Sequence, residues 1–376
     1  GLISPRSVVR SHFPLPKKYY YMKTVCFVLG TRPETIKLYP LIKIFKKKFK
    51  LYVVHTGQHY DYNMQGQFFK DLNVKPDAYL NLNTNNSSRK IFINSLVKKL
   101  MKIFLSLNPD YIINQGDTDS VRSSVLAFNK VKKKINCKLI HIEAGIRSFD
   151  KKMSEENNRI LADKYSDFLF APTKIAKKNL INEKINGNKI YVFGNTISDS
   201  IKLFFKKKKN KKNFFFLTLH RLETVNKKER LVTTLSTLID LIKKLKTKII
   251  FPAHPRTMKK MKKYKIKNIN KVNLIKPCSY KKSLSYINNA RLVITDSGGL
   301  QEEACILNTP CVTIRKNTER PETLKIKSNL LTGYNKRKIR LGILEMINKK
   351  IIWKQPYGNN VSKKIVSIIF KDAYKK

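Results

Sequence analysis

The stretch TVCFVLGTRPETIKLYPLI, residues 24–42, decides the fold. Its first six residues form an uncharged run that is rich in β-branched and aromatic side chains, which predicts a buried strand. Gly30 follows this strand, and Pro33 marks the opening of a helix. A strand that leads into a helix indicates a βαβ unit, so we expect a parallel sheet.

Short apolar runs alternate with helical patterns along the rest of the chain. The further strands that we predict are 51–55, 111–114, 139–142 and 168–171, and then 191–193, 214–219, 249–252, 292–295 and 311–314. Two such series predict an α/β fold made of two doubly wound, Rossmann-like domains with a cleft between them.

The length agrees with two domains, since 376 residues at about 150 per domain give two rather than one or four. We expect a first domain over 22–192 and a second over 193–355. The tail, 356–376, holds a helical run that we expect to pack back on the first domain. Residues 1–21 contain no acidic side chain and precede Met22, so we interpret them as an extraneous or disordered segment.

The charge is strongly positive, with 79 Lys and Arg against 25 Asp and Glu, a net +54. One interpretation is an anionic partner such as nucleic acid, an acidic membrane or a phosphorylated small molecule. The other is a compositional bias, which the even spread of lysine favours because nucleic-acid binders usually concentrate their charge. We therefore expect neither a nucleic-acid nor a membrane partner.

The sequence also argues against a membrane-spanning, a disulfide-rich and a metal-binding protein. No stretch approaches the ~18 uninterrupted apolar residues that a membrane-spanning helix needs. Five cysteines without a C-x-x-C pair predict neither a disulfide framework nor a zinc site, and they favour a reducing, cytoplasmic location. His55 and His59 have a metal-like spacing, but Gly57 lies between them and no glutamate completes the motif, so we expect no metal.

Ionisable residues or glycines follow nearly every predicted strand. Open parallel sheets bind ligands at the carboxyl ends of their strands, so these residues are candidates for a functional site. Asp117, Glu143 and Glu155 come from the first domain and His220 from the second; facing one cleft, they would form a general acid/base set. Taken singly, each of them is better explained by a structural role than by a catalytic one.

A phosphate site is predicted where Ser297, Gly298 and Gly299 precede a helix, because free N–H groups and the positive helix end favour an anion there. Arg320 would offer a two-pronged donor to a second phosphate. Arg32 and Lys37 flank the first helix start and are either ligand-binding cations or a solvated cap. The pattern matches neither the dinucleotide fingerprint nor the P-loop, so we expect no nicotinamide or other cofactor.

At this point the sequence resembles a known family. The segments GTRPETIKLYPLI, TGQH, QGDTDS, HIEAGIRSFD, SEENNR, APT, GNTISDS, LTLHRLETV, PAHPRT, DSGGLQEEA and NTERPET occur in the order typical of the non-hydrolysing UDP-N-acetylglucosamine 2-epimerases. The resemblance covers about 23–372. It implies a glycosyltransferase-B type fold, a homodimer, and a UDP-sugar in the cleft.

The resemblance also implies roles for individual residues. Asp117, Glu143 and Glu155 would be the acid/base carboxylates, with His220 beside them. The substrate would be bound by a set from both domains: Arg32, Lys37, Cys278, Ser283, Ser297, Gly298, Gly299, Glu303 and Arg320. Within it Glu303 would bind the ribose. Ser283 stands where the family usually has an aromatic near the uracil, so Tyr280 or backbone contacts would compensate; Ser154 replaces a common proline.

The implied reaction is elimination of UDP to a glycal, followed by readdition that yields UDP-N-acetylmannosamine. Two alternatives stay open: a hydrolysing 2-epimerase that releases N-acetylmannosamine and UDP, and a 2-epimerase for a modified sugar such as a diacetamido uronate. A second UDP-N-acetylglucosamine molecule would act as an activator next to the active site. Its candidate residues are Gln58, His59, Arg221 and His254, with ordinary polar loops as the alternative.

Overall fold

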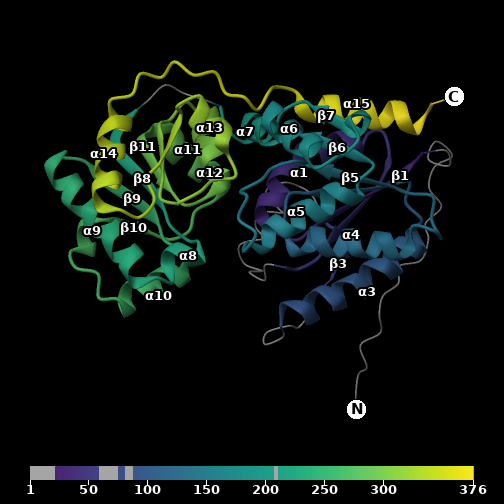
Figure 1. Cartoon of the computed structure of the whole chain (residues 1–376), viewed down its shortest axis with the longest axis horizontal. Coiled ribbons are helices and arrows are strands. Elements are labelled where there is room, and N and C mark those ends of the chain that lie inside the picture. Colours follow the sequence, from purple (N-terminus) through teal and green to yellow (C-terminus); the bar gives the residue numbers. More distant parts are fainter. Residues whose placement is uncertain (1–21, 59–74, 81–87, 207–210, 376) are drawn as a thin grey trace, which may run out of the picture.

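The computed structural model describes residues 22–58, 75–80, 88–206 and 211–375. They form two lobes side by side, each a parallel sheet covered by helices (Figure 1). The α/β fold of two Rossmann-like domains predicted from the sequence is confirmed. Within the described residues, no helix is long and apolar enough to cross a membrane.

The first sheet has seven strands in the order β3-β2-β1-β4-β5-β6-β7. Helices connect most of the strands and make every pairing parallel. In chain order its elements are β1 (Thr24–Leu29), α1 (Arg32–Phe45), β2 (Lys50–His55), β3 (Ala78–Tyr79), α3 (Arg89–Leu107), β4 (Tyr111–Gln115), α4 (Asp119–Val131), β5 (Lys138–Ile142), α5 (Ser154–Tyr165), β6 (Phe168–Ala171), α6 (Lys174–Asn182) and β7 (Ile190–Val192).

The second sheet has six strands in the order β10-β9-β8-β11-β12-β13, again all parallel. Its elements are α7 (Ile197–Phe204), β8 (Lys212–Thr218), α8 (Leu222–Val225), α9 (Lys228–Lys244), β9 (Lys248–Pro252), α10 (Pro255–Lys263), β10 (Asn273–Ile275), α11 (Tyr280–Asn289), β11 (Ala290–Thr295), α12 (Gly298–Ile306), β12 (Cys311–Thr313), α13 (Pro321–Lys325), β13 (Asn329–Leu331) and α14 (Lys336–Ile347). Short 3₁₀ turns cover Gly187–Lys189 and Ile269–Lys271.

The strand β1 shows why the first sheet is buried on both faces. Successive side chains of a strand point to opposite faces. Accordingly Val25, Phe27 and Leu29 pack with α1 and with the last helix, α15 (Val361–Ala373), whereas Cys26 and Val28 pack with α3 and α4. An uninterrupted apolar run is what such a strand requires.

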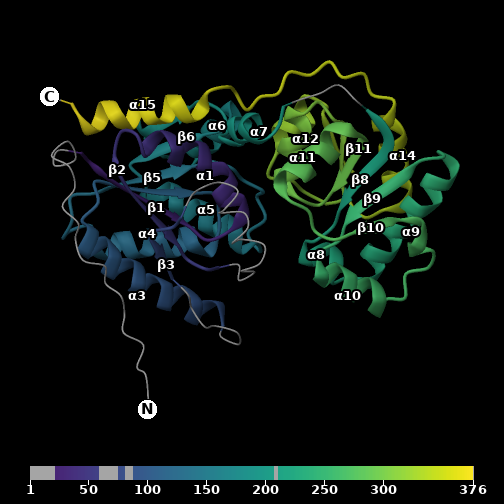
Figure 2. The same ribbon diagram turned by 180° about the vertical axis from the view of Figure 1, so that it is seen from behind.

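Two elements connect the lobes. Helix α7 follows β7 and contacts α1 and α15 in the first lobe and α11 and α12 in the second. After α14 the chain crosses back over the top of the molecule, so that α15 lies on the first lobe and contacts α1 (Figure 2). The final helix therefore belongs to the core of the first lobe, where Ile365 and Ile369 are buried.

In each sheet the chain first adds strands on one side of a central strand and then on the other side. This change of direction falls between β1 and β4 in the first sheet and between β8 and β11 in the second. At such a reversal the connecting loops diverge to opposite sides, which opens a crevice at the carboxyl ends of the strands. The loops after β1 and β4 hold Gly30 and Asp117, and those after β8 and β11 hold His220 and Ser297. The two crevices therefore bring the predicted site residues together.

Candidate active site

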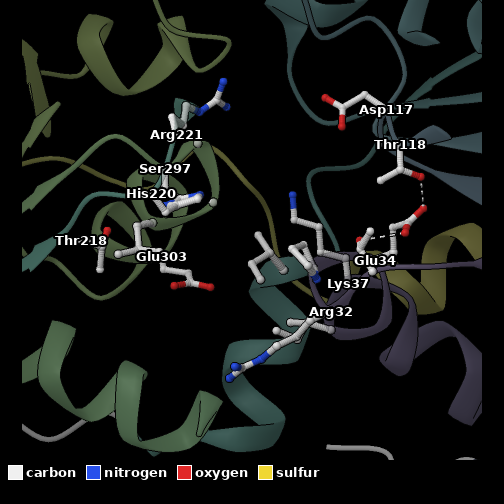
Figure 3. Close-up of a pocket in the computed structure, with 18 of the residues that line it drawn as sticks. Arg32, Glu34, Lys37, Asp117, Thr118, Thr218, His220, Arg221, Ser297 and Glu303 are labelled. Carbon is white, nitrogen blue, oxygen red and sulfur yellow. Dashed lines mark hydrogen bonds between the residues drawn. The ribbon is translucent and has the colours of Figure 1, made fainter. Parts of the chain in front are cut away.

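One cleft of about 560 Å³ lies between the lobes. Figure 3 shows first-lobe residues such as Asp117 and Lys37 on one wall and second-lobe residues such as His220 and Glu303 on the other. The predicted site residues that line it are Arg32, Lys37, Gln58, Asp117, Glu143, Glu155, His220, Arg221, His254, Cys278, Ser283, Ser297, Gly298, Gly299, Glu303 and Arg320. The remaining one, His59, lies outside the described residues.

Asp117 is held at the mouth of the β4 crevice by the geometry of its loop. Gly116 before it has φ +77°, a left-handed conformation that favours glycine. Thr118 after it caps α4 by accepting a hydrogen bond from the Val121 N–H. Arg159 of α5 forms a salt bridge with the Asp117 carboxylate, which stays partly exposed to the cleft.

Glu143 follows β5 in a left-handed conformation, φ +71°, which is uncommon for a residue with a side chain and often marks a functional site. Its buried carboxylate contacts Lys37 Nζ at 2.6 Å and Arg320 Nη2 at 3.1 Å, and accepts hydrogen bonds from the Asn195 and Gln115 side chains. Burial alone would raise the pKa of Glu143, but Lys37 and Arg320 outweigh it and lower the pKa to about 2.

Lys37 is 6% exposed, so the interpretation of Lys37 as part of a solvated cap is wrong. Its ammonium also contacts Glu302 Oε2 at 2.9 Å, and Arg320 Nε contacts Glu302 Oε1 at 2.6 Å. Two carboxylates and two cations, together with the Asn195 amide, thus form one buried cluster at the base of the cleft. A buried charge needs such partners, because its desolvation is costly.

Glu34 is a second buried acid on the first wall. It accepts hydrogen bonds from the Gly30 N–H at 3.0 Å, the Thr31 hydroxyl at 2.8 Å and the Thr118 hydroxyl at 2.7 Å. Thr31 and Glu34 have the spacing of a capping box, but the Thr31 hydroxyl donates to Glu34 and caps no backbone N–H. Burial raises the pKa of Glu34 to about 7, although these hydrogen bonds favour the ionised form.

Asp296 organises the second wall. This fully buried carboxylate accepts hydrogen bonds from the backbone N–H groups of His220 and Arg221, each at 3.0 Å, and lies 3.2 Å from His220 Nδ1. Burial opposes ionisation, but the contacts with His220 outweigh it, and the pKa of Asp296 lies below its ordinary value. The His220 ring is thereby oriented while about half of its surface stays open to the cleft.

Helix α12 begins at Gly298 with Ser297 as its N-cap, so the two glycines form its first turn rather than preceding it as expected. The Ser297 side chain makes no capping hydrogen bond; both Ser297 and Gly298 line the cleft, although Gly298 is buried. These residues therefore present helix N-terminal donors to an anion, with Arg320 nearby. Glu303, one turn into α12, lies beside the buried Tyr280; burial and the neighbouring Glu302 raise its pKa to about 7.

The remaining predicted residues also find places on the cleft. Arg32 reaches across it and donates to the Cys278 carbonyl at 3.3 Å, next to Ser283 and Tyr280. Gln58 accepts hydrogen bonds from the Ser120 N–H and hydroxyl, and His254 caps α10 through Nδ1. Within the ranges that the structure describes, no three His, Cys, Asp or Glu side chains form a metal-like group.

Several site residues were missed. Glu34, Thr118 and Glu319 line the cleft, while Glu302, Asn195 and Asp296 support it from below. Glu319 pairs with Arg221 at 3.0 Å and with Arg315 at 2.7 Å. All six lie within the quoted motifs, and all but Asn195 lie near a residue that was singled out; that proximity was the only available signal.

Two crevices of parallel sheets that face each other across one cleft, with acids on one wall and a helix N-terminus on the other, define a two-domain α/β protein with a ligand site between its lobes. A sequence model of UDP-N-acetylglucosamine 2-epimerase matches residues 43–370. The chain belongs to the UDP-N-acetylglucosamine 2-epimerase family and is an isomerase.

Individual relatives agree with this assignment. The UDP-N-acetylglucosamine 2-epimerase of Methanocaldococcus jannaschii is 42% identical over 92% of this chain and 99% of its own. The crystal structure of the M. jannaschii enzyme in complex with UDP-GlcNAc and UDP aligns with a TM-score of 0.84, 41% identity and the same coverage. A UDP-2,3-diacetamido-2,3-dideoxy-D-glucuronate 2-epimerase of Pseudomonas aeruginosa is 34% identical over 81% of this chain and 87% of its own.

Proposed function

We propose that this chain interconverts UDP-N-acetylglucosamine and UDP-N-acetylmannosamine by eliminating and readding UDP. The observation that carries the proposal is the opposition of the two cleft walls. Carboxylates at the carboxyl ends of β4 and β5 face the N-terminus of α12 across a cavity that has the size of a small-molecule site. A sugar ring between the walls would meet proton-transfer groups while its diphosphate occupied the helix end.

The chemistry needs two bonds to break. A base removes the proton from carbon 2, the anomeric C–O bond breaks, and its electron pair leaves with UDP, so that a glycal remains. UDP then adds back and a proton is delivered to the opposite face of carbon 2. Asp117 and Glu155, both on the cleft surface, would exchange these protons, and His220 would supply a third titratable group from the facing wall.

The leaving diphosphate needs positive charge. The N-terminus of α12 and Arg320 would stabilise it, because oriented donors are most effective in a water-poor site. When a diphosphate arrives, Lys37 and Arg320 would share their charge with it. The Glu143 carboxylate would then lose part of the stabilisation that keeps its pKa near 2, so its basicity would rise only when substrate is bound.

An NMR assay tests the proposal. UDP-N-acetylglucosamine is incubated in deuterated water with the purified full chain and no added cofactor. We expect UDP-N-acetylmannosamine with deuterium at carbon 2, because readdition takes its proton from solvent. A product without deuterium would exclude elimination and readdition.

The two alternatives give different spectra. Free N-acetylmannosamine and UDP would identify a hydrolysing enzyme. The similarity to the P. aeruginosa enzyme favours including a diacetamido uronate as a second substrate. A preference for it by more than about tenfold in kcat/KM, equal to about 1.4 kcal/mol of transition-state binding, would make the modified sugar the substrate.

The same proposal includes a homodimer in a reducing, cytoplasmic compartment and UDP-N-acetylglucosamine as an activator. All five cysteines are free thiols, which agrees with a reducing compartment. Light scattering of the purified chain would give twice the 43.8 kDa mass of one chain for a dimer.

A further inference from the structure

Glu34 joins two turns of the chain that meet at the first-lobe wall of the cleft. Its Oε2 accepts hydrogen bonds from the Gly30 N–H at 3.0 Å and the Thr31 hydroxyl at 2.8 Å, both in the turn after β1. Its Oε1 accepts a hydrogen bond from the Thr118 hydroxyl at 2.7 Å, in the turn after β4 (Figure 3). One carboxylate therefore ties together the two turns between which the first sheet changes direction.

The turn after β1 is itself packed tightly. A Cβ at Gly30 would lie 2.0 Å from Thr56 Oγ1 and 2.1 Å from Ser120 Oγ, so a residue with a side chain would clash there. These two hydroxyls form a hydrogen bond with each other at 2.6 Å, and both residues are buried. Glu34 is only 2% exposed. The carboxylate is therefore fixed from the β1 side, and it can fix what it contacts on the β4 side.

Thr118 links Glu34 to Asp117, its neighbour in the chain. As the N-cap of α4, the Thr118 hydroxyl accepts a backbone N–H while it donates to Glu34, so both sides of the hydroxyl are occupied. From the opposite side, the Asn158 amide of α5 donates to the Asp117 carbonyl at 2.9 Å, and Arg159 pairs with the Asp117 carboxylate. Asp117 is thus held between the β1 turn and α5, with its carboxylate partly open to the cleft.

We propose that Glu34 is a positioning residue for Asp117, and that it acts through the Thr118 hydroxyl to set where the Asp117 carboxylate stands in the cleft. This rests on the proposed function, in which Asp117 exchanges protons with the sugar. Proton transfer needs groups at hydrogen-bond distance, and a displacement of about 1 Å costs up to about 10²-fold in rate. A carboxylate suits the role because it accepts all three hydrogen bonds, whereas an amide would turn its own N–H₂ toward one of the three donors.

Steady-state kinetics of the full chain test the proposal with the variants Glu34→Gln, Thr118→Val, their double variant and Thr118→Ser. Turnover of UDP-N-acetylglucosamine is followed by NMR at pH 8, above the pKa of about 7 of Glu34, so that the unmodified carboxylate is ionised. We expect Glu34→Gln and Thr118→Val each to lower kcat by about tenfold or more while the Kd of UDP, measured by calorimetry, stays within about twofold. The double variant should be no slower than the slower single variant, because both changes break the same contact. Thr118→Ser keeps the hydroxyl and should retain most of kcat.

The matched control is Thr173→Val. Thr173 caps α6 in the same lobe by accepting the Ala176 N–H, as Thr118 caps α4, but it is not among the described residues that line the cleft. The control should lose stability as Thr118→Val does and keep its kcat. Three results would each overturn the proposal: an equal loss of kcat in the control, a kcat of Glu34→Gln within about twofold of the unmodified chain, or losses that multiply in the double variant.

Amide hydrogen exchange separates this role of Glu34 from the choice of substrate. Mass spectrometry measures the exchange of the segment 116–121, which should be faster in Glu34→Gln than in the unmodified chain and unchanged in Thr173→Val. Absence of turnover in the unmodified chain would contradict the proposed function alone. Unchanged exchange of this segment in Glu34→Gln would overturn the positioning role, whichever sugar the chain acts on.

Discussion

Lys37 of α1 and Glu302 of α12 form a buried ion pair, with Nζ and Oε2 2.9 Å apart, that joins the two lobes beneath the cleft. Lys37 also contacts Glu143, and Arg320 contacts both acids. The first-lobe wall and the second-lobe wall of the cleft therefore share one charge cluster. A change of charge on one wall therefore changes the electrostatic energy of the charged residues on the other.

The variant Lys37→Met should lower the free energy of unfolding by about 3–5 kcal/mol, because it leaves the buried Glu143 and Glu302 short of one cation. Glu302→Gln should also destabilise the chain. The loss of unfolding free energy in the double variant should be about 1–3 kcal/mol smaller than the sum of the losses in the two single variants. Urea unfolding followed by circular dichroism measures all three, and strict additivity would show that the pair is not coupled.

The raised pKa of Glu34 predicts an unusual pH dependence of the free energy of unfolding. Its pKa is about 7 in the folded chain and 4.5 ordinarily, so between these values the folded state binds a proton that the unfolded state has released. Stability should therefore fall as pH rises from about 4.5 to 7. Glu303, with a pKa of about 7, acts in the same direction.

The variant Glu34→Gln cannot titrate and should flatten this slope without removing the part due to Glu303. Melting temperatures at pH 5, 6 and 7 and matched ionic strength provide the measurement. If the slope of Glu34→Gln equalled that of the unmodified chain, the raised pKa of Glu34 would be excluded.

Most of the fold was predictable because the central strands are long and apolar. The strands 24–29 and 168–171 match β1 and β6 residue for residue, and the other eight agree within two residues at each end. The missed strands β3, β10 and β13 are two or three residues long and lie at sheet edges. So short a segment carries too few residues to show a period, and only its pairing with a neighbour makes it a strand.

The site was predictable where a residue follows a strand, since topology brings all strand ends to one edge. Its supporting contacts were not. Asn195 contacts Glu143 and Glu302 at separations of 52 and 107 residues, and no local pattern reports such distances. Glu302 lies in the buried face of a helix, where a carboxylate is acceptable only because Lys37 and Arg320 arrive from elsewhere in the chain.

The variants Asp117→Asn, Glu143→Gln and Glu155→Gln should each lower kcat by about two orders of magnitude or more, which is the range for a lost acid or base. Their folds should persist because each change keeps the side-chain shape, although Glu143→Gln should lower the free energy of unfolding, since it leaves Lys37 and Arg320 short of one carboxylate. Turnover is measured by NMR, and UDP affinity by calorimetry serves as the control. Near-normal turnover in a folded variant would remove that residue from the proton transfers.

Gly298→Ala should weaken UDP binding by at least tenfold. A Cβ at this position would lie 2.2 Å from Glu319 Oε1, and Glu319 cannot yield because Arg221 and Arg315 hold it. At Gly299 the same atom would come no closer than 3.9 Å to Ser297 Oγ, so Gly299→Ala should cost less. Equal losses in the two variants would show that the steric contact with Glu319 is not the cause.

The activator prediction concerns Gln58 on the first wall and Arg221 and His254 on the second, which line the same cleft. A ligand that bridged them would favour the closed arrangement through its higher affinity for that state. The reaction from UDP-N-acetylmannosamine alone should then begin slowly and accelerate when a little UDP-N-acetylglucosamine is added. Gln58→Ala should blunt the response to added UDP-N-acetylglucosamine while it leaves the acid/base set in place. A reaction that starts at full rate, with no response to the addition, would leave the cleft with a single ligand.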